Sequence, residues 1–332
     1  MTKVALLGAG WAGAVHAMAS NAVRGGHVTQ VVSRTVAGAQ RLVDGSGAES
    51  SVGIGTYAEL QPGTEVAIVA TPASHHLEAA RLALGAGCAV LVEKPLAVDV
   101  AEADELIAAA EASGKLCGYA ENLLFAPAYL ALAEHARRIG PLHRLHLRFH
   151  NEAPAWGHFT EALPGGGVLH DLGAHPIALA LALADSEPQS VTCTVRSRRE
   201  DGADDEASMA IRFTSGLEAT IDVSWTATRP DWAVEIASDA GAGRWEVFPD
   251  PLLELDGEDA TPRATDAAAP DDHLISLGYV AQLQGFVDAV AGRGGSVCPL
   301  GFGRLVAEVT AAGYASDAAG GAPQPIRSSP GD

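Results

Sequence analysis

The N-terminal end of this chain constrains its fold more strongly than any other stretch. Residues 3–7 form a short apolar run typical of a buried strand, and Gly8-Ala9-Gly10-Trp11-Ala12-Gly13 follows at once. An alanine-rich stretch to about Arg24 then predicts a helix. In that context, a GxGxxG spacing indicates a dinucleotide site rather than a merely structural turn, because its glycines make the turn, admit a pyrophosphate and pack helix on strand. The expected contacts are Gly8, Gly10, Trp11, Ala12 and Gly13.

Strands and helices continue to alternate up to residue 121. Strands are predicted at 28–32, 66–70, 89–92 and 116–120, with helices at 74–84 and 99–112. This alternation predicts an α/β architecture with a doubly wound parallel sheet, a Rossmann domain over residues 1–121. In such sheets, ligands bind at the carboxyl ends of the strands. Thr71-Pro72 stops one strand at that edge and is therefore expected near the dinucleotide.

The end of the second strand bears on the choice of dinucleotide. An NAD-binding domain usually carries Asp or Glu here to hold the ribose hydroxyls. This chain has Ser33-Arg34 instead, a hydroxyl and a guanidinium that suit a 2′-phosphate. The sequence therefore favours NADP(H) over NAD(H), the alternative being a solvent-exposed arginine at a strand end.

The pattern changes after residue 121. A helix is predicted at 125–139, followed by strands at 145–150, 191–196, 207–213, 217–225, 232–238 and 244–248. Gly, Asp and Pro between these strands indicate turns, so residues 122–332 are predicted to form an α+β domain with a large, mostly antiparallel, open sheet. A polar loop is expected at 256–272, with helices at 273–291 and 303–319. The last helix is a candidate to pack back on the first domain.

Composition excludes several classes of partner. The formal net charge is -20, with 41 acidic against 21 basic residues, which repels nucleic acid and anionic membranes. The cysteines are scattered without CxxC pairs, as expected for thiols in a reducing compartment. The chain opens without a secretory pattern, and its apolar run at 177–184 is too short to span a bilayer. A cytoplasmic protein is predicted.

A glycine-rich stretch in the second half carries ionisable residues. Gly165-Gly166-Gly167 precedes Val168-Leu169-His170-Asp171, and His175 follows four residues after Asp171. On one helix, this spacing puts Asp171 and His175 on the same face, one turn apart, as a proton-transfer pair would require. The alternative is a glycine-rich turn and a helix whose polar residues face solvent.

Lys94 supplies a further candidate for chemistry. It follows the predicted strand 89–92 in the sequence Glu93-Lys94-Pro95. Hydride transfer to or from a hydroxyl-bearing carbon also moves a proton, which His175 can accept or donate while Asp171 orients the ring and favours its charged form. Lys94 can hydrogen-bond the reacting oxygen and stabilise developing negative charge there. The alternative for Lys94 is a surface lysine before a proline turn.

Two other residues invite a functional interpretation. His170 and His175 are five residues apart, which does not put two metal ligands on one helical face, so no metal site is expected. Trp156 precedes the glycines and is a candidate sugar-stacking wall, with core packing as the alternative.

In the order and spacing of these motifs, nearly the whole chain resembles the glucose-fructose oxidoreductase, inositol dehydrogenase and MocA family. The resemblance rests on the N-terminal GxGxxG, Thr71-Pro72 with His76 downstream, Glu93-Lys94-Pro95, and GGGxxxDxxxH from Gly165 to His175. It implies that Lys94, Asp171 and His175 are catalytic and that the Lys94-Pro95 peptide is cis, as in some relatives. It also implies a dinucleotide site that includes Thr71, Pro72, His76, Glu93 and Lys94.

The resemblance extends to substrate and assembly. It implies a substrate contact by His175 and by Asn122, although Glu121-Asn122 departs from the more usual aromatic-Asn pair and leaves the substrate class open. It further implies a homodimer or homotetramer formed through the open sheet of the second domain. An apolar face is expected on that sheet, and such a face would need a partner, because large exposed apolar patches are rare in monomers.

The predicted function is an NADP(H)-dependent oxidoreductase that transfers a hydride to or from a sugar, polyol or related keto compound. A reductase of a non-carbohydrate carbonyl is the alternative among enzymes. A non-enzymatic dinucleotide-sensing regulator is the alternative from another class. The joint presence of Lys94, Asp171 and His175 argues for an enzyme, because a sensor has no need of them.

Overall fold

A computed structural model of the chain describes residues 1–45, 52–56, 60–155, 157, 159–198, 202–263 and 272–326. The chain divides into two compact units, Met1–Ala126 with Ala264–Arg304, and Pro127–Arg263 with Leu305–Asp332. This division departs from the predicted boundaries, which gave residues 264–304 to the second domain. The reason is that helices α8 (Asp272–Ser276) and α9 (Tyr279–Val290) pack against α1 (Trp11–Ser20) of the first unit.

The first unit contains a six-stranded sheet of order β3-β2-β1-β4-β5-β6 in which every pair is parallel. This confirms the predicted doubly wound arrangement. Leu7 of β1 pairs with both Val32 of β2 and Val69 of β4, so the carboxyl ends of these three strands meet at one edge. The strands are β1 (Thr2–Leu7), β2 (Gly26–Ser33), β3 (Gly53–Thr56), β4 (Val66–Val69), β5 (Ala89–Glu93) and β6 (Cys117–Ala120).

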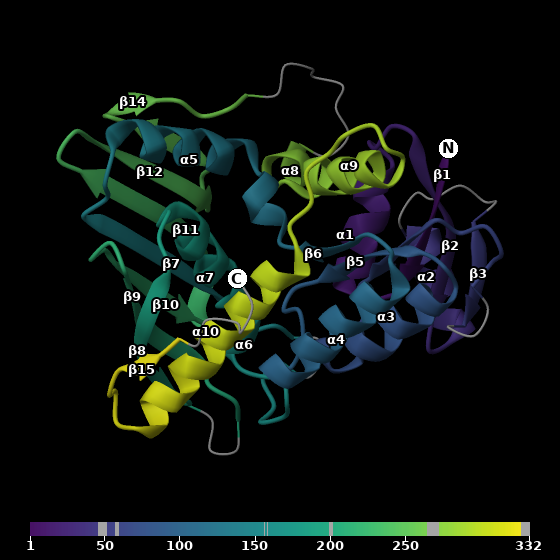
Figure 1. The fold of residues 1–332 in the computed structure, drawn as a ribbon, viewed down its shortest axis with the longest axis horizontal. Coiled ribbons are helices and arrows are strands. Elements are labelled where there is room, and N and C mark those ends of the chain that lie inside the picture. Colours follow the sequence, from purple (N-terminus) through teal and green to yellow (C-terminus); the bar gives the residue numbers. More distant parts are fainter. Residues whose placement is uncertain are drawn as a thin grey trace. The chain divides into compact units, whose positions relative to one another are not determined.

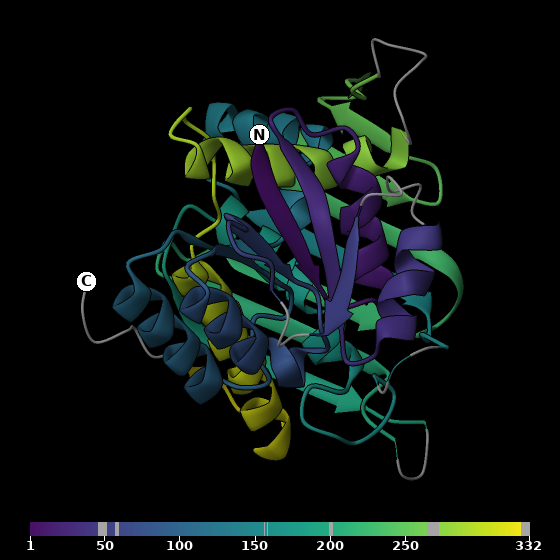
Figure 2. The same ribbon diagram turned by 90° about the vertical axis from the view of Figure 1, so that its right-hand side faces the viewer.

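Helices cover both faces of this sheet (Figures 1 and 2). Side chains of α1, α2 (Val36–Gly45) and α9 share one buried apolar cluster with β1, β2, β4 and β5. Helix α3 (His76–Gly85), which follows the short turn η2 (Ala73–His75), packs against β4, β5 and α4 (Val100–Ser113). Asp99 caps α4 by accepting from the Glu102 amide at 2.8 Å, and Gly114 ends it in the left-handed region.

The second unit is built on a nine-stranded sheet of order β14-β13-β12-β11-β7-β10-β9-β8-β15. Among the strands in the described ranges, only β7 and β10 pair in parallel, which confirms a mostly antiparallel sheet. β13, β14 and β15 are short strands that the sequence analysis did not predict. The strands are β7 (Arg144–Glu152), β8 (Pro188–Arg196), β9 (Glu206–Phe213), β10 (Glu218–Ser224), β11 (Thr226–Ser238), β12 (Gly241–Phe248), β13 (Leu252–Leu255), β14 (Glu258–Asp259) and β15 (Gln324–Pro325).

Helices pack against one face of this second sheet. Leu145, Leu147 and Phe149 of β7 alternate with polar neighbours and are at most 1% exposed. α5 (Pro127–Ile139) packs on β11, β12 and β13, and α6 (Val168–Asp171) and α7 (Ala174–Leu183) pack on strands that include β10. Helix α10 (Leu300–Ala318) begins in the first unit, and from Leu305 it belongs to the second, where Ser316 accepts from the Cys193 amide at 2.9 Å.

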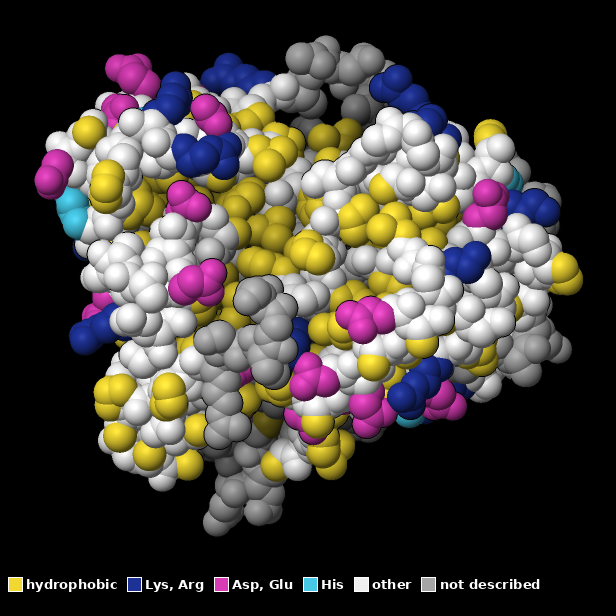
Figure 3. All heavy atoms as spheres, viewed as in Figure 1, with side chains coloured by type: hydrophobic (Ala, Val, Ile, Leu, Met, Phe, Trp, Pro, Cys, Tyr) yellow, Lys and Arg dark blue, Asp and Glu magenta, His cyan; other side chains and the backbone are white. Residues whose placement is uncertain are grey.

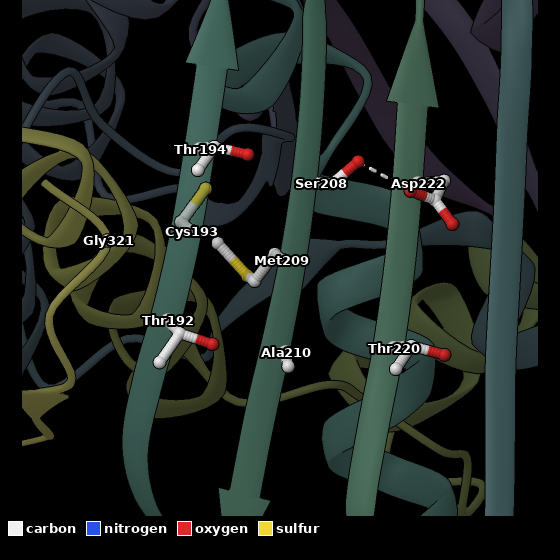
Figure 4. Close-up of a pocket in the computed structure, with 9 residues that line it drawn as sticks. All are labelled: Thr192, Cys193, Thr194, Ser208, Met209, Ala210, Thr220, Asp222 and Gly321. Atoms are coloured by element: carbon white, nitrogen blue, oxygen red, sulfur yellow. Dashed lines mark hydrogen bonds between the residues drawn. The ribbon is translucent and has the colours of Figure 1, made fainter.

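The other face of this sheet is polar, so the expectation of an apolar face was wrong. Arg144 pairs with Glu235 at 2.8 Å and Arg148 with Asp231 at 2.9 Å across neighbouring strands. A recess of about 420 Å³ lies on this face. Figure 4 draws the residues that line it, among which Ser208 donates to Asp222 at 2.7 Å. The alternation of the strands sends their apolar residues to the helices and leaves hydroxyl and charged side chains outside.

Charge is dispersed over the surface that Figure 3 shows, where acidic and basic side chains of the described residues lie interspersed. Within the described ranges, no helix combines the length and apolar character needed to cross a membrane.

Candidate active site

The glycine turn after β1 has the geometry that its fingerprint predicts. A Cβ on Gly8, whose φ is +118°, would lie 2.3 Å from the Ala70 carbonyl oxygen, and a Cβ on Gly13 would lie 2.3 Å from the Gly8 oxygen. These two glycines are therefore required by the protein itself. A Cβ on Gly10, in contrast, would meet nothing within 4 Å. Gly10 thus keeps open the space into which a pyrophosphate would project.

The N-terminus of α1 faces the same space. Gly10 is its N-cap and has no side chain that could accept from the first turn, so the amides there are not capped by it and can donate to an anion. The hydroxyl of Thr71, just after β4, is buried without a hydrogen-bond partner among the described residues. Trp11 is 57% exposed at the first position of the helix. An open cradle, helix amides and an orphaned hydroxyl fit a dinucleotide.

The turn after β2 is held by its own hydroxyls. Ser33 donates to the Thr35 carbonyl at 2.6 Å, and Thr35 caps α2 by accepting from the Gly38 amide at 3.1 Å. Arg34 between them is exposed. The Nη2 atom of Arg41 lies 3.8 Å from where a Gly38 Cβ would stand, so this guanidinium folds back over the first turn of α2. The sequence analysis missed Arg41.

Glu93 fixes the strand end that carries Lys94. Its Oε1 accepts from Nε2 of His16 on α1 at 2.7 Å, and its Oε2 accepts from the Lys94 main-chain amide at 3.0 Å. Burial alone would raise the pKa of Glu93, but the hydrogen bond and charge of His16, with Lys94 and His76, outweigh it and hold that pKa below its ordinary value. Glu93 is therefore a carboxylate, and Lys94 itself is half-buried.

His76 supports the other side of the same turn. Its Nε2 lies 2.8 Å from the Thr71 carbonyl oxygen and its Nδ1 lies 3.2 Å from the Leu96 oxygen. Burial lowers the pKa of His76 despite both carbonyls, which favour the charged form. The Lys94-Pro95 peptide between the supports is cis, as the family resemblance implied. His76 and Glu93 thus shape the dinucleotide edge from within.

Asn122 serves the framework of the first unit. It opens the turn η3 (Asn122–Phe125), is 3% exposed, and its Nδ2 donates to the Leu277 carbonyl at 2.8 Å. With its amide oxygen turned inward, Gln282 of α9 accepts from the amides of Glu121 and Asn122 at 3.1 and 3.0 Å. The predicted substrate contact of Asn122 stays a prediction.

In the second unit, the glycine stretch wraps around Asp204. The Asp204 carboxylate accepts from the Leu169 amide at 2.9 Å and from the Tyr314 hydroxyl at 2.9 Å. Gly167 has φ +104°, and a Cβ there would lie 2.1 Å from Asp204 Oδ1. Burial raises the pKa of Asp204 against these hydrogen bonds. A glycine is therefore required where the carboxylate crosses the start of α6.

The prediction that Asp171 and His175 lie on one continuous helix was wrong. α6 ends at Asp171 and α7 begins at Ala174. Between them, the Gly173 amide donates to the Val168 carbonyl five residues back, at 2.9 Å, which widens the turn. A Cβ on Gly173 would lie 2.2 Å from the Leu169 oxygen, so glycine permits this break. Such widened turns are frequent at functional sites.

An aromatic cluster that the sequence analysis missed lies beside His175. His175 is 6% exposed, and its ring centroid lies 5.8 Å from that of Trp232. Trp232 stacks on Phe149 at 4.7 Å and meets Phe248 edge-on at 5.0 Å. Its Nε1 is buried without a hydrogen-bond partner among the described residues. Trp156, the predicted wall, lies outside the described residues.

Metal chemistry gains no support from the side chains. Over the ranges described, no group of three or more His, Cys, Asp or Glu side chains is arranged to hold a metal ion.

Comparison with known sequences identifies both halves of the chain. Residues 2–121 match the family described as an oxidoreductase family with an NAD-binding Rossmann fold, and residues 133–244 match the GFO/IDH/MocA C-terminal domain. Mouse trans-1,2-dihydrobenzene-1,2-diol dehydrogenase is 30% identical over 61% of this chain and 62% of its own length. D-apiose dehydrogenase from Paraburkholderia graminis is 26% identical over 61% of this chain and 56% of its own length.

Solved structures resemble the chain over nearly its whole length. GenD2 from gentamicin A biosynthesis, in complex with NAD, has a TM-score of 0.84 at 27% identity and covers 98% of this chain and 97% of its own. A levoglucosan dehydrogenase in complex with NADH and L-sorbose shares the fold, with a TM-score of 0.84 at 19% identity over 98% and 99% of the chains. With both domain families matched in order, this protein belongs to the Gfo/Idh/MocA oxidoreductase family.

Proposed function

We propose that this protein is an NADP(H)-dependent dehydrogenase or reductase acting on a sugar, polyol or related keto compound. The observation that carries the proposal is the Gly8–Gly13 cradle, open at Gly10, in the same unit as a lysine that a buried carboxylate holds at the end of β5. Relatives named as dehydrogenases of D-apiose and of a cyclic diol support the substrate class.

The roles of the residues follow from their chemistry. A bound nicotinamide supplies or takes the hydride. Lys94 donates a hydrogen bond to the reacting oxygen, where negative charge develops. His175 takes the hydroxyl proton in oxidation and returns it in reduction, and Asp171 orients the imidazole. We propose that the three act on one substrate.

The preference for NADP(H) rests on the turn after β2. No carboxylate stands at Ser33-Arg34-Thr35 to hold ribose hydroxyls. Arg34 precedes α2 and is exposed, and the guanidinium of Arg41 folds over the first turn of that helix. That arrangement suits a 2′-phosphate. The NAD bound to GenD2 is a property of that protein, and a comparison of NADPH and NADH affinities tests the preference of this one.

A non-carbohydrate carbonyl is the second candidate substrate, and one observation favours it. Trp232, Phe149 and Phe248 bring an apolar surface to His175, which would bury an apolar or aromatic group well. Sugars also stack on indole faces, so the cluster suits both classes. A dinucleotide sensor would use neither this cluster nor the proton-transfer residues.

We also propose that the protein forms a homodimer or homotetramer through the open face of its second sheet. The cross-strand ion pairs and hydroxyl side chains of that face suit a polar interface of closed symmetry.

The test is a substrate panel with each dinucleotide. NADP+ and NAD+ are offered with aldoses, inositols and cyclic diols, and NADPH and NADH with ketoses and aromatic carbonyls, while absorbance of the reduced nicotinamide is followed. We expect NADP(H)-linked turnover on a polyhydroxylated compound. Turnover confined to aromatic carbonyls would favour the second candidate, and dinucleotide binding without turnover on any compound would favour the sensor.

A further inference from the structure

A buried hydrogen-bond relay joins the dinucleotide helix to the catalytic lysine. His16 lies on α1, one turn beyond Gly13, and its side chain is 0% exposed. Glu93 ends β5, and its side chain is 8% exposed. The two residues are 77 positions apart, yet Nε2 of His16 lies 2.7 Å from Oε1 of Glu93. Since a carboxylate only accepts, the imidazole donates.

The second carboxylate oxygen continues the relay. Oε2 of Glu93 accepts from the main-chain amide of Lys94 at 3.0 Å. The Glu93 carboxylate therefore connects the side chain of His16 on α1 with the main chain of Lys94, the residue that follows Glu93. The two bonds have the geometry that fixes both oxygens of Glu93 and, through them, the peptide from which the Lys94 side chain departs.

We propose that His16 is a positioning residue that, through Glu93, sets the main chain of Lys94 relative to the helix of the dinucleotide turn. The inference rests on the proposed function, in which Lys94 hydrogen-bonds the reacting oxygen. His16 itself touches no reacting atom. A shift of about 1 Å in the position of a reacting group lowers turnover strongly. Loss of the hydrogen bonds that position Lys94 should therefore lower turnover.

The surroundings of His16 favour positioning over simple core packing. Its Nδ1 is buried without a hydrogen-bond partner among the described residues, so within that part of the chain the ring hydrogen-bonds through Nε2, to Glu93. Tyr279 of α9 packs edge-on against the ring, with centroids 5.9 Å apart, and restricts its rotation. A buried polar pair adds little stability over apolar residues of the same size, so its main contribution is to fix the geometry of Glu93.

Several ionisable side chains surround Glu93, and their charges must be considered when the protonation of Glu93 is followed. His16 and Lys94 contact Glu93 directly, and His76 on α3 acts on it through its charge, so that all three lower the pKa of Glu93. The charge of Glu93 in turn raises the pKa of Tyr119 on β6 and of Tyr279 on α9. Burial and nearby carboxylates raise the pKa of both tyrosines well above their ordinary value, so they stay neutral over the working range. Protonation of Glu93 on acidification then weakens the bond to the Lys94 amide.

The lysine content makes this bond observable without any substrate. The chain has only Lys3, Lys94 and Lys115, so selective 15N-lysine labelling of the perdeuterated protein gives three backbone amide signals. The Lys94 signal is assigned by its loss in Lys94→Arg. Its proton shift is then followed from about pH 4 to about pH 9 in the unmodified protein and in two variants.

The two variants differ in reach alone. In His16→Gln, the side-chain amide can occupy the place of Nε2 and still donate to Glu93. In His16→Asn, the shorter side chain ends where Nδ1 of the histidine lies, so its amide cannot reach Glu93 to donate a hydrogen bond. We expect His16→Gln to keep the shift and titration of Lys94, and His16→Asn to move the amide upfield and its titration midpoint to higher pH. A Lys94 signal in His16→Asn that matches the unmodified protein would overturn the proposal.

Turnover completes the test, with a control for the loss of a buried histidine. His135→Asn removes a 4%-exposed histidine that contacts the Ala242 carbonyl in the second unit, and it should leave the Lys94 signal and turnover unchanged. On the substrate found, we expect His16→Asn to lower kcat about tenfold or more at unchanged dinucleotide affinity, with rescue in His16→Gln. Equal kcat in the two His16 variants would overturn the proposal, as would wild-type NMR behaviour in both. An inactive unmodified protein with the expected NMR shifts would instead contradict the proposed function and leave the relay geometry confirmed.

Discussion

At the residue scale, we propose that the arginines after β2 determine the preference for NADP(H) over NAD(H). Arg34→Ala and Arg41→Ala each remove a cation from the turn that ends in the α2 cap. We expect the unmodified protein to bind NADPH more tightly than NADH. Each substitution should narrow that gap by roughly 1–3 kcal/mol, the scale of a charge-assisted hydrogen bond to a phosphate. Isothermal titration calorimetry measures both affinities, and equal or tighter NADH binding by the unmodified protein would refute the assignment.

Two buried groups with lowered pKa values make the free energy of unfolding depend on pH. The folded pKa of His76 lies below its ordinary value of 6.5, and that of Glu93 below 4.5. The unfolded chain therefore takes up protons that the folded chain does not, so stability is full above these ordinary values and falls as pH drops through them. We expect the free energy of unfolding in urea to fall between about pH 7 and about pH 5, with a smaller slope in His76→Gln. An equal slope in the variant would contradict this.

What the sequence reveals at this scale depends on sequence distance. The turn at Gly8–Gly13 could be predicted because all of its constraints lie within a few residues. His16 lies in α1, the helix that this turn begins, and its role was missed because its partner Glu93 is 77 positions away. Trp232 was missed for the same reason, since nothing near it in sequence points to His175.

At the scale of elements, the start of α6 depends on a glycine in contact with Asp204. Gly167→Ala would combine an unfavourable φ of +104° with a Cβ 2.1 Å from a carboxylate oxygen. Gly216→Ala is a matched control, because Gly216 has φ +88° and nothing within 4 Å of its Cβ position. We expect the control to cost about 1 kcal/mol in urea unfolding and Gly167→Ala to cost about 1–3 kcal/mol more. Equal losses in the two variants would mean that Asp204 is not held there.

The elements also show where periodicity fails as a guide. The strands of both units were predictable, because burial on both faces gives a continuous apolar run and burial on one face gives an alternation of apolar and polar residues. The break between α6 and α7 was not, since the residues from Val168 onward have a helical pattern throughout. Gly173 permits that break through its contact with the Leu169 oxygen, which no local pattern reveals.

At the scale of the whole molecule, we propose that a second copy of the chain binds to the polar open face of the second sheet. We expect a dimer or tetramer at micromolar concentration by sedimentation velocity. Ala210→Arg places a long cation in the recess between β8 and β10 and should dissociate the assembly. A monomeric unmodified protein would refute this proposal, and an intact assembly in Ala210→Arg would show that this face is not the interface.

The division of the chain into units was predicted only in part. The change from parallel to antiparallel pattern after residue 121 is visible in sequence. The return of α8 and α9 to the first unit is not, because it depends on contacts of Leu283, Phe286 and Val287 with strands near the N-terminus. An apolar helix pattern shows that a face will be buried but does not identify the surface that buries it.

We propose that Lys94 and His175, which belong to different units, serve one reaction. The measurement is a double-mutant cycle of turnover on the identified substrate, with dinucleotide affinity measured in parallel. We predict that His175→Ala lowers turnover about a hundredfold or more, that Lys94→Ala does likewise, and that the double variant loses far less than the product of the two. Dinucleotide affinity should barely change in His175→Ala, because the cradle at Gly8–Gly13 lies in the other unit. Near-normal turnover in His175→Ala, or losses that multiply in the double variant, would contradict this account.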